Sequence, residues 1–417
     1  MERYSEYKDS GVKWLGEIPS HWEVKRLGSF FFERKEKVSD KDYAPLSVTK
    51  QGIFPQLENV AKTNDGDNRK LVKEGDFVIN SRSDRKGSSG VSGLDGSVSL
   101  INIVLQPRKV LFGPFCNYLL KSYGFIEENY RNGRGIVADL WTTRYDEMKM
   151  IKVAMPSFEE QKNISSYLDA ATSKIDKAIA MQQNMIDLLN ERKQIIIQNA
   201  VTKGLDENVE MKDSGVEWIG MIPKHWKVRR GKFLFRVVNE YSTTGQEELL
   251  TVSDRTGITP RSMKNVNMFM SESLIGYKKC QKGDICSNIM WMWHGAVGVT
   301  EYNGVISPSY GVYRQIAFSY DNKYLDYMLR LPRLVEVYGN CSTGLTESRL
   351  RLYPDDFMNL QFFVPPLEEQ KCIVLQIQKQ IIAIEKSIEN AEKLIALLQE
   401  RKQIIINEVV TGKVKVS

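Results

Sequence analysis

LLNERKQIII at residues 188–197 and LLQERKQIII at residues 397–406 are one sequence written twice, with nine of ten residues identical. A Glu-Glu-Gln-Lys run lies about thirty residues before each stretch, at 159–162 and at 368–371. A second repeat, KDSGVKWLGEIPSHWEVKR at 8–26 and KDSGVEWIGMIPKHWKVRR at 212–230, is identical at thirteen of nineteen positions. The 417 residues are therefore a duplication of a unit of about 205 residues, and not three domains of average size.

Each unit ends in a segment with the pattern of a long helix. No proline or glycine occurs from Ser157 to about Ala200, Pro156 precedes the segment, and Ser157-x-x-Glu160 has the form of a capping box. Apolar residues recur at alternating intervals of four and three: Ile377, Ile381, Ile384, Ile388, Ala391, Ile395, Leu398 and Ile405 in the second copy, and Leu168, Ile175, Ile179, Ile186, Leu189 and Ile196 in the first. This seam predicts a coiled coil, with a rod of about 64 Å.

A helix with one narrow apolar stripe needs a partner. The other copy in the same chain is the expected partner, in an antiparallel pair related by a pseudo-two-fold axis, with the two domains at opposite ends of a spacer. A coiled coil between two chains of a homodimer is the alternative.

The remaining parts are rich in turns and in short β-branched runs, such as 76–80, 98–105 and 305–313, with a helix expected at 323–330. The predicted fold class is α/β: two pseudo-symmetric α/β domains separated by an antiparallel two-helix coiled coil. The expected boundaries are 1–156 and 206–365 for the globular domains, and 157–205 and 366–417 for the spacer helices.

Composition excludes some classes of protein. An apolar content of 42% is enough to build cores, which excludes a disordered chain. No apolar run approaches the ~18 residues of a membrane span, and residues 1–13 lack the apolar region of a signal peptide. The five cysteines are scattered without paired spacing, so we expect reduced thiols and a cytoplasmic location. A net charge of +6 permits DNA binding without requiring it.

A search for catalytic motifs finds none. Metal-ligand spacings, phosphate-binding loops and nucleophile elbows are absent, and so is the Pro-Pro-aromatic tetrapeptide of adenine methyltransferases. Glu160-Gln-Lys162 and Glu369-Gln-Lys371 resemble a nuclease ExK, but each lies at an expected helix start, where acidic residues are favoured by the helix dipole. We predict no catalytic residue and no metal site.

Two sets of residues have the chemistry of binding sites. The first is basic, polar or aromatic and is predicted to contact DNA: Lys50, Gln51, Arg82, Arg85, Lys86, Arg255, Arg261, Trp291, Trp293 and His294. Arg82–Lys86 falls at the repeat position of Met290–His294, so one frame carries two different chemistries. A solvated charged face is the plain alternative. The second set, Trp14, Trp22, Trp218 and Trp226, either packs the repeat head or anchors a protein partner, and packing is favoured.

Taken together, the repeat head, the variable domain, the PxxEEQK run and the ERKQIII helix resemble the specificity subunit of type I restriction–modification systems, along the full chain and in both copies. The resemblance implies a non-catalytic, DNA-binding subunit whose two target-recognition domains each read half of a bipartite double-stranded DNA sequence. It also implies docking of methyltransferase subunits, with two expected, and restriction subunits in the full complex. S-adenosylmethionine, ATP and Mg would be bound by these partners, and this chain would need no cofactor.

Two other hypotheses stay open from the sequence. A self-sufficient nuclease or methyltransferase would need a metal or methyl-donor site, which the sequence lacks. A coiled-coil scaffold without a nucleic-acid role would show no salt-dependent DNA binding.

Overall fold

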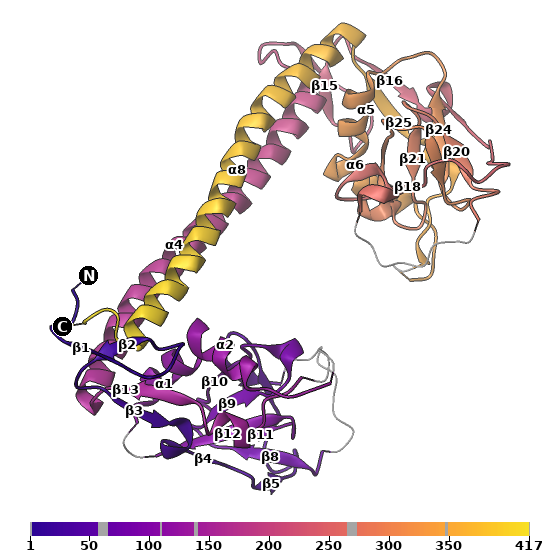
Figure 1. Ribbon diagram of the computed structural model, residues 1–417. Helices are drawn as coiled ribbons and strands as arrows, with labels where there is room; N and C mark the ends of the chain where they lie inside the picture. The colour runs from indigo at the N-terminus through magenta and orange to yellow at the C-terminus, as the bar shows by residue number, and fades with distance from the viewer. Residues whose placement is uncertain are drawn as a thin grey trace. The chain divides into compact units, whose positions relative to one another are not determined.

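The computed structural model describes residues 2–56, 66–108, 111–136, 141–264, 273–346 and 349–416. The chain forms two compact units (Figure 1), one made of Met1–Asn184 with Ala391–Ser417 and the other of Met185–Asn390. Each unit therefore contains one globular domain, the start of the helix that follows it and the end of the other long helix.

The first globular domain is built from small antiparallel sheets. A four-stranded sheet has the order β10-β9-β12-β4, with β10 Ser89–Val91, β9 Phe77–Asn80, β12 Asn102–Pro107 and β4 Phe31–Glu33. The other strands are β11 Gly96–Val98, β8 Arg69–Val72 and β5 Lys37–Val38 in one sheet, and the pairs β1 Tyr7–Asp9 with β2 Glu17–Pro19, β3 Glu23–Arg26 with β13 Lys152–Met155, and β6 Leu46–Val48 with β7 Ile53–Pro55. Its short helices are α1 Gly113–Leu120, α2 Tyr123–Arg131 and α3 Tyr145–Met148, and its 3-10 turns are η1 Leu27–Ser29 and η2 Ser83–Arg85.

The second domain repeats this arrangement. Its four-stranded sheet has the corresponding order β22-β21-β24-β17, with β22 Val297–Val299, β21 Ile285–Ser287, β24 Gly311–Gln315 and β17 Phe235–Val237. The paired strands are β14 Met211–Asp213 with β15 Met221–Pro223, β16 Lys227–Arg230 with β25 Gln361–Val364, β18 Leu250–Ser253 with β19 Gly257–Pro260, and β20 Lys278–Cys280 with β23 Gly304–Ile306. Helices α5 Asn322–Leu329, α6 Pro332–Cys341 and α7 Pro354–Asn359 follow, and the 3-10 turns are η4 Gly231–Phe233, η5 Arg261–Met263 and η6 Met292–His294.

The two long helices are α4 Phe158–Lys203 and α8 Leu367–Val410 (Figure 1). Lys402 pairs with Asp176 at 2.7 Å in the first unit, and Lys193 pairs with Glu385 at 2.6 Å in the second. The two pairs are 17 residues apart on each helix and run in opposite directions, so the helices are antiparallel and pair within one chain. Every residue of the predicted apolar seam is buried or half-buried. The intramolecular coiled coil expected from the sequence is confirmed.

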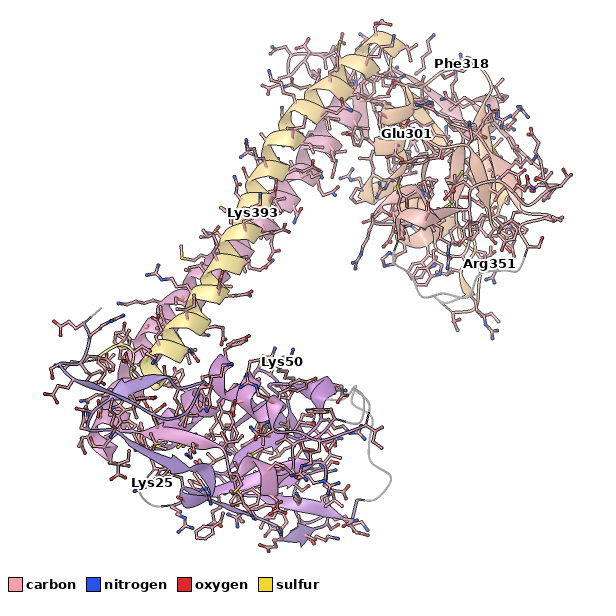
Figure 2. All side chains as sticks on the ribbon, in the orientation of Figure 1. Lys25, Lys50, Glu301, Phe318, Arg351 and Lys393 are labelled. Carbon is pink, nitrogen blue, oxygen red and sulfur yellow. The ribbon has the colours of Figure 1, made fainter. Side chains whose placement is uncertain are left out.

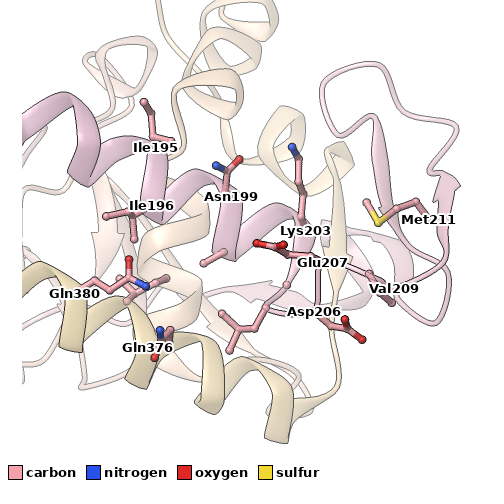
Figure 3. A pocket seen from close by; sticks show the side chains of 14 residues that line it. Ile195, Ile196, Asn199, Lys203, Asp206, Glu207, Val209, Met211, Gln376 and Gln380 are labelled. Atoms are coloured by element: carbon pink, nitrogen blue, oxygen red, sulfur yellow. The ribbon is translucent and has the colours of Figure 1, made fainter. Parts of the chain in front are cut away.

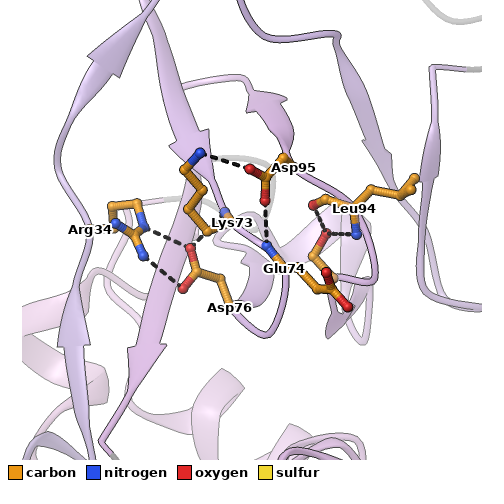
Figure 4. Close-up of polar contacts among 7 residues, drawn as sticks. Arg34, Lys73, Glu74, Asp76, Leu94 and Asp95 are labelled. Carbon is orange, nitrogen blue, oxygen red and sulfur yellow. Dashed lines mark hydrogen bonds and ion pairs between the residues drawn. The ribbon is translucent and has the colours of Figure 1, made fainter.

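A buried carboxylate fixes the start of the central strand in both domains. Asp76 accepts two bonds from the Arg34 guanidinium, at 2.7 and 3.1 Å, and one from the amide of Lys73 (Figure 4). Asp284 is held in the same way by Arg314, at 2.7 Å twice, and by the amide of Gln281. The hydrogen bond to the carboxylate raises the pKa of each arginine above its usual value.

The two arginines come from different strands. Arg34 follows β4, whereas Arg314 lies in β24, which corresponds to β12 of the first domain. Pairing registers place Val238 at the position of Arg34 and Gln106 at the position of Arg314. The carboxylate has kept its place in both copies, while the cation has exchanged between neighbouring strands.

Some local expectations need correction. The runs at 98–105 and 305–313 are not single strands, because each contains the end of one strand, a turn and the start of the next. The Ser157 hydroxyl does accept from the Glu160 amide at 3.3 Å, but the Glu160 side chain does not complete a capping box, because it is bonded elsewhere. The helix expected at 323–330 is confirmed as α5, and all five cysteines are free thiols. Within the described ranges, no helix is both long and apolar enough to cross a membrane.

Candidate nucleic-acid interface

The loop after the central strand has the same backbone frame in both domains. In the first, the Asn80 side chain accepts from the Arg82 amide at 3.0 Å, and in the second Asn288 accepts from the Met290 amide at 3.2 Å. A 3-10 turn follows in each case, η2 or η6. The first turn presents exposed Arg82 and Arg85, and the second presents aromatic rings. The sequence prediction of one frame with two chemistries is thus confirmed as geometry.

The aromatic side chains of η6 form one cluster. Trp291 and Trp293 are stacked, with ring centroids 5.9 Å apart and planes at 17°. His294 meets both rings edge-on, and Trp291 is 54% exposed. An exposed indole stacked on a second ring is held in place and offers a flat apolar face, which suits a base or a sugar.

In the first domain the matching side chains are cationic. Lys86 lies 4.4 Å from the centre of the Tyr130 ring and pairs with Glu127 at 2.7 Å. Arg85 lies near Asp84, but its side chain is 68% exposed. The Lys86 ammonium is therefore partly engaged by contacts within the domain, whereas the guanidinium N–H donors of Arg85 are largely accessible to solvent.

A hairpin turn flanks each of these loops. Lys50 and Gln51 are exposed in the turn between β6 and β7, which is joined to β10 by a bond from the Ser89 amide to the Thr49 carbonyl at 3.1 Å. Arg255 is exposed in the matching turn between β18 and β19, next to Asp254, which pairs with His294 at 3.1 Å. The fold therefore joins most of the predicted DNA-binding residues into one surface per domain. Arg261 is the exception, because it lies in η5 at the other end of the β18–β19 hairpin.

The Glu-Gln pair that is repeated at the start of each long helix has a structural role. Glu160 accepts from Trp22 Nε1 at 3.0 Å, from the Tyr4 hydroxyl at 2.6 Å and lies 3.0 Å from His21 Nε2. Glu369 repeats this with Trp226 at 3.1 Å and His225 at 2.7 Å. Burial, together with the bond to Glu160, raises the pKa of Tyr4. In each copy, hydrogen bonds to this glutamate thus join the repeat head, 8–26 or 212–230, to the start of the long helix; we call this contact the clamp.

The neighbouring glutamine holds the residue just before the first short helix of its domain, α1 or α5. Gln161 accepts from the Phe112 amide and donates to the Pro156 carbonyl, and Gln370 does the same with Asp321 and Pro365. Lys162 and Lys371 pair with the exposed Glu159 and Glu368. The ExK pattern is therefore a helix-start clamp, and no cluster of metal-ligating side chains occurs among the described residues.

The tryptophan prediction is corrected in part. Trp22 and Trp226 are 0% exposed, so a partner subunit cannot touch them in this structure, and their role is packing. Trp14 and Trp218 are partly buried, next to Phe125 and Phe363, and their contact with a partner stays a prediction.

Comparison with known proteins agrees with this architecture. No family model matches the sequence. A curated protein of Methanocaldococcus jannaschii, named by inference as the type I restriction enzyme MjaX specificity subunit, is 23% identical over 461 aligned residues, covering 98% of each chain. The chain is therefore similar to this type I specificity subunit along nearly its whole length.

Solved structures show the specificity-subunit fold. A chain from work on complex assembly and conformational transition of the type I R-M system superposes with a TM-score of 0.68 at 15% identity, over 95% of this chain and 99% of that one. The HsdS subunit of Thermoanaerobacter tengcongensis superposes with a TM-score of 0.51 at 15% identity, over 97% and 100% of the two chains. Two α/β domains with two long helices are thus the arrangement expected of a specificity subunit.

Sequence reasoning missed a second loop in each domain. After α2, Arg134 and Thr142 exchange backbone bonds of 2.8 and 3.0 Å, and after α6, Thr343 and Arg351 do so at 2.9 Å. The Thr143 amide donates to Ser81 at 3.0 Å, and Leu352 donates to Ile289 at 3.0 Å. The described residues at the base of each loop are therefore joined to the segments that lead into η2 and η6. The offset of 209 between Gly135-Ile136 and Gly344-Leu345 is the signal that would have found them.

Proposed function

We propose that this chain is the DNA sequence-specificity subunit of a type I restriction–modification complex, and that each globular domain reads one half of a bipartite target. The observation that carries the proposal is the repeated loop frame with different side chains, Arg82–Lys86 in one copy and Met290–His294 in the other. Readers of two different half-sites need this combination of a shared frame and divergent surfaces. The whole-length relationship to a named specificity subunit supports it.

The loop chemistry suits DNA in both domains. Arginine donates in pairs to guanine or to phosphate, and lysine neutralises phosphate, so Arg82, Arg85 and Lys50 fit a groove contact. Trp291 and His294 offer stacking and hydrogen bonding in place of charge. The two half-sites should therefore differ in base composition as well as in sequence.

We assign no chemistry to this chain itself. Adenine methylation and DNA cleavage would be performed by methyltransferase and restriction subunits, which would bind S-adenosylmethionine, ATP and Mg. We expect two methyltransferase subunits, because an exposed apolar stripe that could dock one occurs on both long helices.

The repeated docking feature is an apolar stripe on the long helices, facing away from the coiled-coil seam. Leu188 and Leu397 are 56% and 62% exposed, and Ile195 and Ile404 are 50% and 48% exposed. In the second unit this stripe borders a hollow of about 770 Å³ between the end of α4 and the start of α8 (Figure 3). Exposed leucine and isoleucine at helical spacing fit an apolar helix of a partner.

Lysine at positions 188 and 397 should abolish stable association with the methyltransferase subunits. Each change puts a charge into an apolar interface but leaves the seam between α4 and α8 untouched, so the melting temperature of the isolated chain should stay unchanged. Co-purification with the methyltransferase subunit measures the effect, and the single variants should each lose one of two copies. Lys174→Glu, at an exposed position elsewhere on α4, is the control for a charge change on the helix surface. Full assembly of the double variant would contradict the docking role.

Mapping of methylated adenines in DNA tests the proposed function. The chain is co-expressed with its methyltransferase subunit, and the methylated positions should define two half-sites with a fixed gap. Replacing residues 205–366 by the matching segment of a relative should change one half-site only. Methylation without sequence preference, or a change in both half-sites, would overturn the proposal.

Removal of one heptad from α4 and the matching heptad from α8 should shorten the gap and leave both half-sites unchanged. Seven residues correspond to about 10 Å of helix, or about three base pairs of duplex. The same mapping of methylated adenines measures the gap. Exchange of seam residues without a change in length, such as Ile384→Leu, is the control. An unchanged gap in the shortened variant would show that the helices do not set it.

A further inference from the structure

Two aliphatic side chains project almost completely into solvent. Ile136 is 96% exposed and Leu345 is 93% exposed, more than any other large apolar side chain among the described residues. Side chains of this kind gain nothing from such exposure, since their burial normally stabilises the fold. Their exposure therefore needs a reason outside the stability of the isolated chain.

The two residues occupy the same place in the duplicated frame. Each follows a glycine, Gly135 or Gly344, in the hairpin that comes after the second short helix of its domain. Much of the surrounding loop sequence differs between the copies, yet both keep a branched aliphatic side chain here. The exposed position belongs to the frame and is not an isolated surface residue.

The base of each hairpin supplies positive charge. One arginine and one threonine exchange backbone bonds there, but their order is reversed: Arg134 faces Thr142, and Thr343 faces Arg351. The Arg134 side chain is 81% exposed and lies 3.3 Å from Glu147. Arg82 also pairs with Thr142, which joins the hairpin to the loop proposed above to contact DNA. An exposed aliphatic side chain close to an arginine suits a nucleic acid, whose bases accept apolar contacts and whose phosphates accept cations.

We propose that Ile136 and Leu345 enter the target duplex, one at each half-site, and make an apolar contact with the bases. This inference rests on the proposed function and adds two specificity-determining residues to it. The arginines at the hairpin base would hold the flanking phosphates while the tip contacts the base edges.

Alanine at each position tests the inference. The full complex with methyltransferase subunits is assembled, and its affinity is measured for three duplexes: the mapped target and two in which one or the other half-site is scrambled. Ile136→Ala and Leu345→Ala should each weaken binding to the intact target about tenfold or more, as expected for loss of one base contact. Each variant should lose its effect on the duplex in which its own half-site is scrambled and keep it on the other. The two variants should therefore lose their effects on different duplexes.

Three controls separate the alternatives. Phe318 is 85% exposed and lies at the opposite edge of the second domain from Arg351 (Figure 2), so Phe318→Ala should leave affinity unchanged. Ile136→Val and Leu345→Ile keep an aliphatic tip and should bind nearly as well as the unmodified chain. The melting temperature of each variant should also be unchanged, because no buried contact is lost.

Two results would overturn the inference alone: alanine variants that bind like Phe318→Ala, or variants that fail to assemble with the methyltransferase subunit, which would make the tips a protein contact. An unmodified complex that does not distinguish the mapped target from the scrambled duplexes would overturn the proposed function, and this inference with it.

Discussion

Alanine in place of Asp284 should destabilise the second unit by about 3–5 kcal/mol, because it leaves the Arg314 guanidinium without its buried partner. The carboxylate is 1% exposed, and the arginine side chain is 19% exposed. For a unit of this size the melting temperature should fall by roughly 6–20 °C. Thermal unfolding followed by circular dichroism measures the effect.

A double variant tells whether the stability is lost because the ion pair is gone or because Arg314 is left as a charge without its partner. Asp284→Ala with Arg314→Met removes both partners and should recover most of the lost stability. Glu301→Ala, which removes a carboxylate with two lysine partners at the surface, should change stability by less than ~1 kcal/mol. If the double variant were as unstable as the single one, the pair would not be the cause.

Alanine at Glu160 should destabilise the first unit by about 2–3 kcal/mol, because the buried indole of Trp22 and the Tyr4 hydroxyl lose their acceptor. The start of α4 should loosen from the repeat head, since this carboxylate joins the two. Thermal unfolding measures the loss of stability, and the amide exchange rates of residues 4–22 measure the loosening.

Glu159→Ala is the matched control for Glu160→Ala, because the two residues are adjacent in the same helix turn. Glu159 is 77% exposed and pairs with Lys162 at the surface, so its loss should cost less than ~0.5 kcal/mol. Equal effects of the two substitutions would mean that the clamp does not hold the repeat head.

The architecture could be predicted from the sequence because repetition and period are visible without coordinates. A seam at intervals of four and three determines which residues of α4 and α8 are buried, and the identical copies identify the partner. The sequence did not show that the repeat head is hydrogen-bonded to the start of the long helix. Trp22 and Glu160 are 138 residues apart, and nothing in either residue type predicts that the two would form a hydrogen bond.

Other features escaped because they depend on cross-strand geometry. The exchange between Arg34 and Arg314 leaves no mark in an alignment of the two copies, since valine and glutamine occupy the vacated positions. The run at 98–105 contains a turn between β11 and β12, and its β-branched residues give no sign of that turn in the sequence. The hairpins that carry Ile136 and Leu345 have no charged or aromatic pattern in common, and their signal in the sequence is a repeated glycine followed by an aliphatic residue.

The last turns of α8 and the residues after them complete the core of the first unit. The Lys415 amide donates to the Glu2 carbonyl at 2.9 Å, and Ile405, Val409, Val410 and Val414 belong to the same core as Trp22 and Leu168. The second unit, by contrast, is one continuous stretch, Met185–Asn390. During synthesis on the ribosome, the first unit therefore needs residues that are made after the whole of the second unit, Met185–Asn390. The order in which the units reach their final cores should be the reverse of the order in which their domains are translated.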